Sequence, residues 1–152
     1  MADIQIHNTQ PGDVELLVTN IRAADAAEIE ACGQEPLSGL RHSVARSLLC
    51  WSAFADGKLA CILGCAPVSM LEGIGSPWMI GTPVLDAHSR VLVRLTPAYI
   101  VQMQTAFPHL VNHVHAANAT SVRWLKRIGF TLDAAEPFGP KGEAFHRFEM
   151  RA

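Results

Sequence analysis

The pattern that most constrains the fold is a strand, a long helical stretch and a second strand in direct succession. SPWMIGTPVL, at 76–85, predicts a strand over about 77–82 that ends at Thr82-Pro83. A helical pattern follows over 87–106, and HLVNHVHAA predicts the next strand at about 109–115. Two neighbouring strands joined through a helix run parallel, and their crossover is right-handed.

The helical stretch carries its own expectations. Val91, Leu95, Ile100 and Met103 are spaced to face inward. Pro97 lacks a backbone N–H and is expected to kink or split the helix.

The flanking segments predict antiparallel hairpins and further helices. Asp56-Gly57 lies between two apolar runs, which is the strongest short hairpin signal, and a terminal hairpin turns around 140–142. A first strand is expected at 4–7, followed by three helices: one entered at Thr9 or Gln10 before Pro11, one at 23–32 ended by Gly33, and one opening near Pro36. The sequence therefore predicts an α/β (α+β) fold over 1–152: one domain with a mixed sheet flanked by helices.

Composition excludes several classes of protein. Of 152 residues, 49% are hydrophobic and 17% charged, so the chain should fold around a core. A formal net charge of -2 disfavours a broad nucleic-acid surface, and no apolar run approaches the roughly 20 residues of a membrane span. The first ten residues do not resemble a secretion signal, and the four cysteines are expected to be buried reduced thiols.

The segment NATSVRWLKRIGF, at 118–130, predicts a capped amphipathic helix. Asn118 is a good N-cap, and Gly129 stands where a left-handed residue ends a helix. Val122, Leu125 and Ile128 share one face, with basic residues largely on the other.

With this order of elements, the segment resembles the Gcn5-related N-acetyltransferase (GNAT) fold. That family typically has Asn, a small residue, an aliphatic-Tyr pair and Gly-Phe here, and Asn118, Ser121, Gly129 and Phe130 match. The resemblance implies a splayed mixed sheet and, for an active enzyme, acetyl-CoA as the acyl donor.

The chain departs from the family pattern at two places. The family's glycine-rich phosphate turn has no counterpart in GTPVLDAHSRVLVRL, where Asp86 would repel a phosphate, and Leu125 replaces the tyrosine acid. Weak or absent acetyl-CoA binding is therefore expected. If the cofactor binds, the resemblance assigns it Asn118 and the helix-entry amides of His88, Ser89 and Arg90.

A narrower resemblance is to small GNAT-like proteins of short-tailed phages, among them an internal virion protein. RAADAAEIEACG, PHLVNHVHAANATSVRWLKRIGF and PFGPKGEAFHRFEM carry it. It implies a capsid-core assembly protein in the virion interior or host cytoplasm, with core or portal proteins as partners and a possible homo-oligomer. Arg123, Trp124 and Arg127 would then form an exposed docking surface, whereas a buried Trp124 is the competing expectation. An N-acetyltransferase and a noncatalytic ligand-binding module remain the alternatives.

Two histidines on the predicted strand at 109–115 are candidates for chemistry. His113 and His115 share one face, and in an active enzyme either could be a general base. A zinc site with His109 is the less favoured alternative, and no metal is expected.

Overall fold

The computed structural model describes residues 1–152 and contains one eight-stranded sheet. The strand order is β1-β2-β3-β4-β5-β8-β6, and β7 pairs with β8. Every pairing is antiparallel except β4 with β5, which is parallel, so the predicted mixed sheet is confirmed. The strands are β1 (Ile4–Asn8), β2 (Leu49–Ala55), β3 (Lys58–Ser69), β4 (Ile74–Gly81), β5 (His109–His115), β6 (Thr131–Leu132), β7 (Glu136–Phe138) and β8 (Glu143–Arg151).

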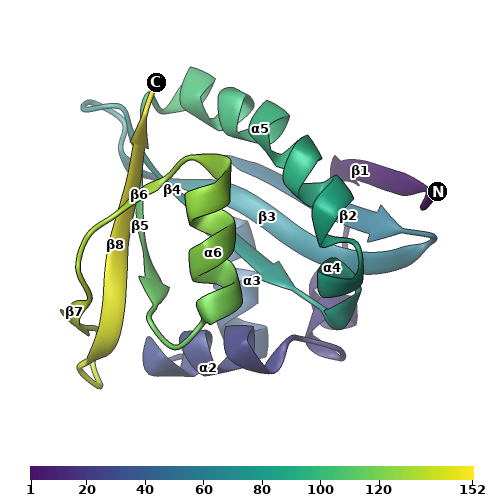
Figure 1. Ribbon diagram of the computed structural model, residues 1–152, viewed down its shortest axis with the longest axis horizontal. Helices are drawn as coiled ribbons and strands as arrows, with labels where there is room; N and C mark the ends of the chain where they lie inside the picture. Colours follow the sequence, from purple (N-terminus) through teal and green to yellow (C-terminus); the bar gives the residue numbers. More distant parts are fainter.

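The parallel strands β4 and β5 separate along their length. They pair only at Ile74 with His109 and at Gly75 with Leu110, and beyond these residues the strands diverge. Figure 1 shows the two strands together at one end and apart at the other, with α6 in front of the gap. The predicted splay is therefore confirmed, and it leaves strand edges in the centre of the sheet that other groups must satisfy.

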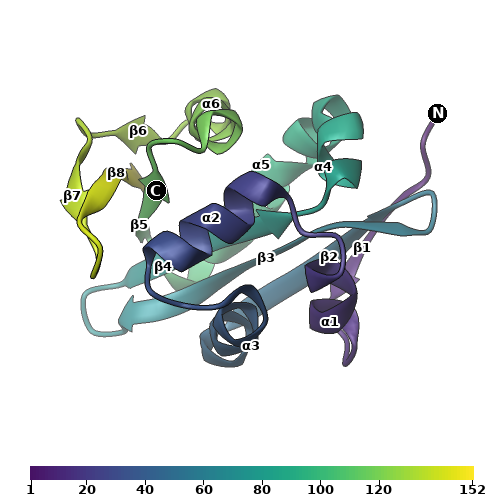
Figure 2. The ribbon, with the colours of Figure 1, turned by 90° about the horizontal axis from the view of Figure 1, so that it is seen from below.

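Six helices surround this sheet. Figure 2 shows α1 and α3 on one face, α4, α5 and α6 on the other, and α2 crossing in front of the ends of β4 and β5. No helix combines the length and the apolar character needed to cross a bilayer. The helices are α1 (Asp13–Val18), α2 (Ala23–Ala31), α3 (Pro36–Arg46), α4 (Pro83–Ala87), α5 (Ser89–Ala106) and α6 (Ala119–Ile128).

The core has two parts, one on each face of the sheet. The larger part lies against α5 and α6 and includes Met103, Phe107, Leu110 and Trp124. The smaller part lies against α1 and α3 and includes Leu17, Leu40 and Ile62. Alternate residues of the central strands supply both parts, because side chains of a strand point to opposite faces.

Two short sequence motifs have the local structures that the sequence predicted. Asp56 and Gly57 both have positive φ, 50° and 78°, as the tight turn between β2 and β3 requires. Asn118 caps α6 by accepting from the Ser121 amide at 3.4 Å, and Gly129 ends this helix with a φ of 107°.

Several expectations about helices were wrong in detail. The first helix begins after Gly12, whose φ is 92°, instead of at Thr9 or Gln10. Pro97 lies inside an unbroken α5, and the break falls earlier, at His88 between α4 and α5. Leu95 is exposed, because the buried face of α5 runs through Leu92, Thr96, Ile100 and Met103. Cys32 is also exposed, whereas Cys61 and Cys65 are buried and all four thiols are free.

Candidate functional site

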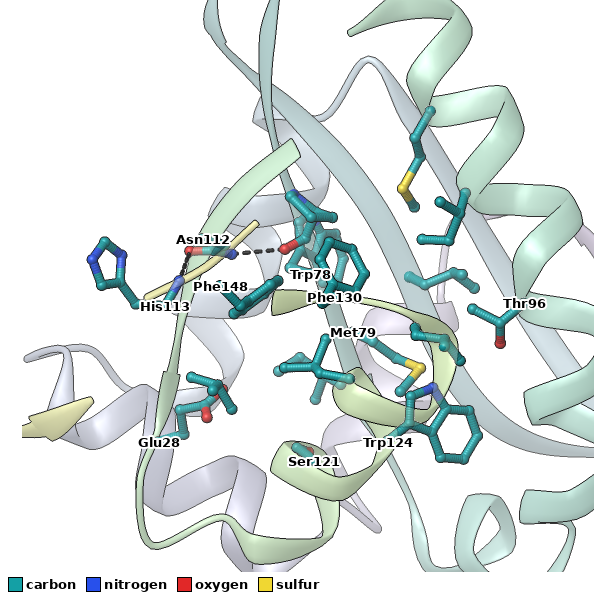
Figure 3. A pocket seen from close by; sticks show the side chains of 18 residues that line it. Glu28, Trp78, Met79, Thr96, Asn112, His113, Ser121, Trp124, Phe130 and Phe148 are labelled. Atoms are coloured by element: carbon teal, nitrogen blue, oxygen red, sulfur yellow. Dashed lines mark hydrogen bonds between the residues drawn. The ribbon is translucent and has the colours of Figure 1, made fainter. Parts of the chain in front are cut away.

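A largely apolar pocket lies in the gap between β4 and β5. Its volume is about 100 Å³, and 12 of the 18 residues that line it are hydrophobic. β4 and β5 supply its floor, and side chains of α5 and α6, among them Ile100, Met103 and Leu125, enclose it. In Figure 3, Glu28 and Trp124 lie on opposite sides of this pocket.

Glu28, on α2, is the one acidic residue in the pocket lining. Its Oε1 accepts a hydrogen bond of 2.8 Å from the backbone amide of His115 on β5. Burial raises the pKa of this carboxyl to about 7, and the hydrogen bond from His115 only partly opposes that rise. Part of the side chain remains accessible. A carboxyl that titrates near neutrality and can reach a ligand has the properties of a general base.

Asp25, one turn before Glu28 on α2, accepts a hydrogen bond from β4, the other strand that borders the gap. Its Oδ2 accepts from the Gly81 amide of β4 at 2.8 Å, and its Oδ1 accepts from the Asn118 side chain at 3.1 Å. Asn112 bridges the strands nearer their junction: its Nδ2 donates to the Pro77 carbonyl at 2.7 Å (Figure 3). These side chains hold the strands apart without leaving these edge groups unpaired.

Arg22 joins this network at the mouth of the gap. It is 7% exposed and donates to both oxygens of Asp25, at 2.8 and 3.0 Å. It also donates to Asp86 at 3.0 Å and to Ser121 at 3.2 Å. The negative charge of Asp86, expected to repel a phosphate, is therefore offset only in part, because Arg22 shares its single positive charge between Asp25 and Asp86.

Trp124 is buried, so the expectation that it is exposed for docking was wrong. It is 7% exposed, lines the pocket, and packs in the larger core, while Arg123 and Arg127 are exposed. Trp124 is the buried residue of α6, and Met79 of β4 and Thr96 of α5 line a small cavity beside it. The Nε1–H of Trp124 is the one buried side-chain polar group without a hydrogen-bond partner. Such a group ordinarily costs about 1–3 kcal/mol.

The two candidate histidines do not point into the pocket. His113 stacks on Phe138 with ring centroids 3.9 Å apart, and Figure 3 shows its imidazole directed away from the cavity. Burial, and then the charge of Arg147, lower the pKa of His113. His115 is buried against Phe145, and its Nε2 lies 3.0 Å from Glu143. His113 is among the residues that line the pocket, but both imidazoles lie on the face of β5 opposite Val114.

His109, the third histidine of β5, has a different partner. His109 Nε2 lies 2.6 Å from Glu149 Oε2. No group of three His, Cys, Asp or Glu side chains is arranged to hold a metal ion.

The residues assigned to a cofactor have different roles in the structure. His88 is the N-cap of α5 and its amide donates to Val84 and Leu85 of α4, whereas Ser89 and Arg90 begin α5, whose first amides have no partner within the helix. Asn118 is 1% exposed and is used internally, between Asp25 and the Ser121 amide. Asn118 therefore caps and braces the site, and a direct contact with a ligand would require these bonds to break.

Sequence reasoning missed Arg22, Asp25 and Glu28. Their partners lie 56 to 99 residues away, apart from the local Arg22–Asp25 pair. One signal was present: the three residues recur at three-residue spacing in an alanine-rich segment, which places them close together along one side of a helix.

Comparisons with known proteins identify the fold. No family model matches the chain, and no curated protein matches it. Among solved structures, a GNAT-family acetyltransferase from Streptococcus pneumoniae is 16% identical with a TM-score of 0.66, covering 99% of this chain and 100% of that one. Spermidine N-acetyltransferase from Vibrio cholerae, in complex with CoA and spermine, is 14% identical with a TM-score of 0.67, covering 97% and 95%.

A third match gives the same result. PaiA N-acetyltransferase from Thermoplasma acidophilum, in complex with coenzyme A, is 15% identical with a TM-score of 0.67, covering 99% of both chains. Identities this low carry the architecture and no particular substrate. With its parallel, splayed β4 and β5 and near-complete coverage of these structures, the chain has the fold of the GNAT acetyltransferases.

Proposed function

We propose that this protein is an acyl-CoA-dependent N-acyltransferase in which Glu28 is the general base. The observation that carries the proposal is the position of Glu28: a carboxyl with a pKa of about 7 in the lining of an apolar pocket between the splayed strands. Structurally similar proteins crystallised with CoA support the choice of acyl donor.

The pocket fits the acyl end of a thioester. Its walls are mostly apolar, and one buried donor, Trp124 Nε1–H, has no partner in the protein. The phosphates would lie toward the start of α5, where Ser89 and Arg90 present helix-entry amides and a positive charge, whereas the His88 amide already donates to Val84 and Leu85. Arg22 reduces the repulsion from Asp86 at the same mouth.

A bound acyl thioester would supply an activated carbonyl carbon. Glu28 would accept a proton from a neutral amine as the C–N bond forms and the C–S bond breaks. The departing thiolate would then take up a proton from water, because Leu125 has none to give. Glu28 would return the amine's proton to the hydroxide that remains, so the net products are an amide and a free thiol.

Thermodynamic and kinetic measurements test this function together. Isothermal titration with acetyl-CoA should show binding, and thiol release with a panel of primary amines should show transfer. Glu28→Gln should lower kcat/KM by about 100-fold or more. Glu30→Gln, an exposed position on the same helix, is the matched control. No binding and no thiol release with any amine would contradict the proposal, and a loss that follows His115→Gln instead of Glu28→Gln would move the base to the imidazole.

The role in virion assembly rests on sequence resemblance alone and remains a prediction. It would place Arg123 and Arg127, which are exposed, on a surface for core or portal proteins, without Trp124. Mass spectrometry of purified particles and procapsids would test it, since the protein should be present in at least one of them.

A further inference from the structure

We propose that the Trp124 indole N–H binds the carbonyl oxygen of the acyl group that occupies this pocket. The inference rests on the proposed function and adds the residue that orients the donor substrate. It starts from the one buried side-chain donor that the protein leaves without a partner.

Most other polar side chains around the pocket are already engaged. Thr96 donates to the Leu92 carbonyl at 2.7 Å. Ser121 Oγ accepts from Arg22 at 3.2 Å, and its own O–H is a second donor in the pocket lining. Asn112 donates to Pro77 and accepts from the His113 amide at 2.8 Å. Glu28, when ionised, is an acceptor only. Trp124 therefore offers the side-chain N–H that is free for a ligand in this pocket.

The surroundings of Trp124 define the acceptor that suits it. Apolar side chains line most of the pocket, so an anionic oxygen would lose its hydration without compensation. A water molecule needs two to four polar partners, and the walls near Trp124 offer few. A neutral carbonyl oxygen attached to an apolar group avoids both difficulties, because it carries no charge and does not need several polar partners.

The second cavity beside Trp124 extends the same argument to the acyl chain. It measures about 20 Å³, nine of its ten lining residues are hydrophobic, and it shares Leu63, Met79, Thr96 and Trp124 with the first. A short apolar chain directed past the indole would enter this small space. The geometry therefore favours a small acyl group held by its carbonyl.

Indole ¹H–¹⁵N spectra of the intact protein test the contact directly. The protein has three tryptophans, and Trp124→Phe identifies the Trp124 resonance. Acetyl-CoA should move this resonance downfield. S-ethyl-CoA, a thioether without the acyl carbonyl, and CoA itself should move it much less. Trp51 is an internal control, because it lines neither of the two cavities.

Each outcome decides the inference. Equal shifts with acetyl-CoA, S-ethyl-CoA and CoA would overturn it, because the acceptor would then lie elsewhere on the ligand. Binding of acetyl-CoA by titration with no shift at Trp124 would also overturn it, while leaving the proposed function intact. No binding of acetyl-CoA at all would overturn both.

Kinetics supply an independent readout. Trp124→Phe keeps an aromatic ring and removes the N–H, so kcat/KM for acetyl transfer should fall about tenfold, the weight of one hydrogen bond. Trp51→Phe should change it less than twofold, since Trp51 lines neither cavity. An unchanged kcat/KM in Trp124→Phe would count against the contact, and the spectra of the unmodified protein remain decisive if this variant folds poorly.

Discussion

Asp25 and Glu28 lie one turn apart on α2, and each accepts a backbone amide from a different strand of the splay. Asp25 binds the amide of Gly81 on β4, and Glu28 binds the amide of His115 on β5, both at 2.8 Å. α2 therefore spans the open end of the gap and satisfies both strand edges there. Neutralising either carboxyl should change stability as well as activity.

Glu28→Gln should remove a pH dependence of the free energy of unfolding. Gln can still accept from His115, but it does not titrate. The folded pKa of about 7 exceeds the ordinary 4.5, so the wild-type protein loses stability as pH rises from 4.5 through 7 and loses no more above it. The loss amounts to at most about 3 kcal/mol.

Urea unfolding at pH 5 and pH 8 measures this effect. The wild type should lose stability relative to Glu28→Gln between the two values, while Glu30→Gln, at an exposed position, should follow the wild type. Parallel behaviour of the wild type and Glu28→Gln would show that the carboxyl ionises normally.

Arg22→Met should destabilise the protein by about 3–5 kcal/mol, because it leaves the buried carboxylate of Asp25 without its cation. The double variant Arg22→Met, Asp25→Asn should recover part of this loss. Asp86→Asn should cost less than about 1 kcal/mol, since the Asp86 side chain is 51% exposed. Chemical denaturation of the wild type, these three variants and the single variant Asp25→Asn tests the network, and additive losses in the double variant would argue against it.

Gly75→Ala should disturb the point where β4 and β5 separate. A Cβ at this position would lie 2.6 Å from two ring atoms of Phe107 and 2.8 Å from Cys65 Sγ. All three residues are buried, so the clash should cost about 1–3 kcal/mol. Thermal unfolding should show a lowered Tm for Gly75→Ala and little change for the neighbouring Ser76→Ala. Wild-type stability of Gly75→Ala would mean that Phe107 moves aside freely.

The elements that the sequence predicted are those determined by neighbouring residues. The Asp56-Gly57 turn, the Asn118 cap and the Gly129 stop depend on local backbone conformation and hydrogen bonds. The parallel pairing of β4 and β5 followed from the length of the connection between them. The fold was therefore largely predictable.

The candidate site was less predictable, because distant residues create it. Glu28 has no unusual neighbours along the chain, and its pKa rises only when α2 buries it against β5. For Trp124 the neighbouring residues were misleading, because the adjacent arginines indicated an exposed surface. The packing of α5 and β4 against α6 determines which residue of α6 is buried. Helical periodicity fixes a face to within about one residue, which was not enough here.

The pH dependence of acyl transfer tests the central claim most directly. With acetyl-CoA and an amine whose own pKa lies well below 7, so that the substrate does not titrate in this range, kcat/KM of the wild type should rise as Glu28 ionises, with a midpoint near 7, and reach a plateau above it. Glu28→Gln should be lower throughout and lack this ionisation. A Glu28→Gln profile that keeps the same midpoint and rate, or the absence of transfer by the wild type at every pH, would contradict the assignment of Glu28 as the base.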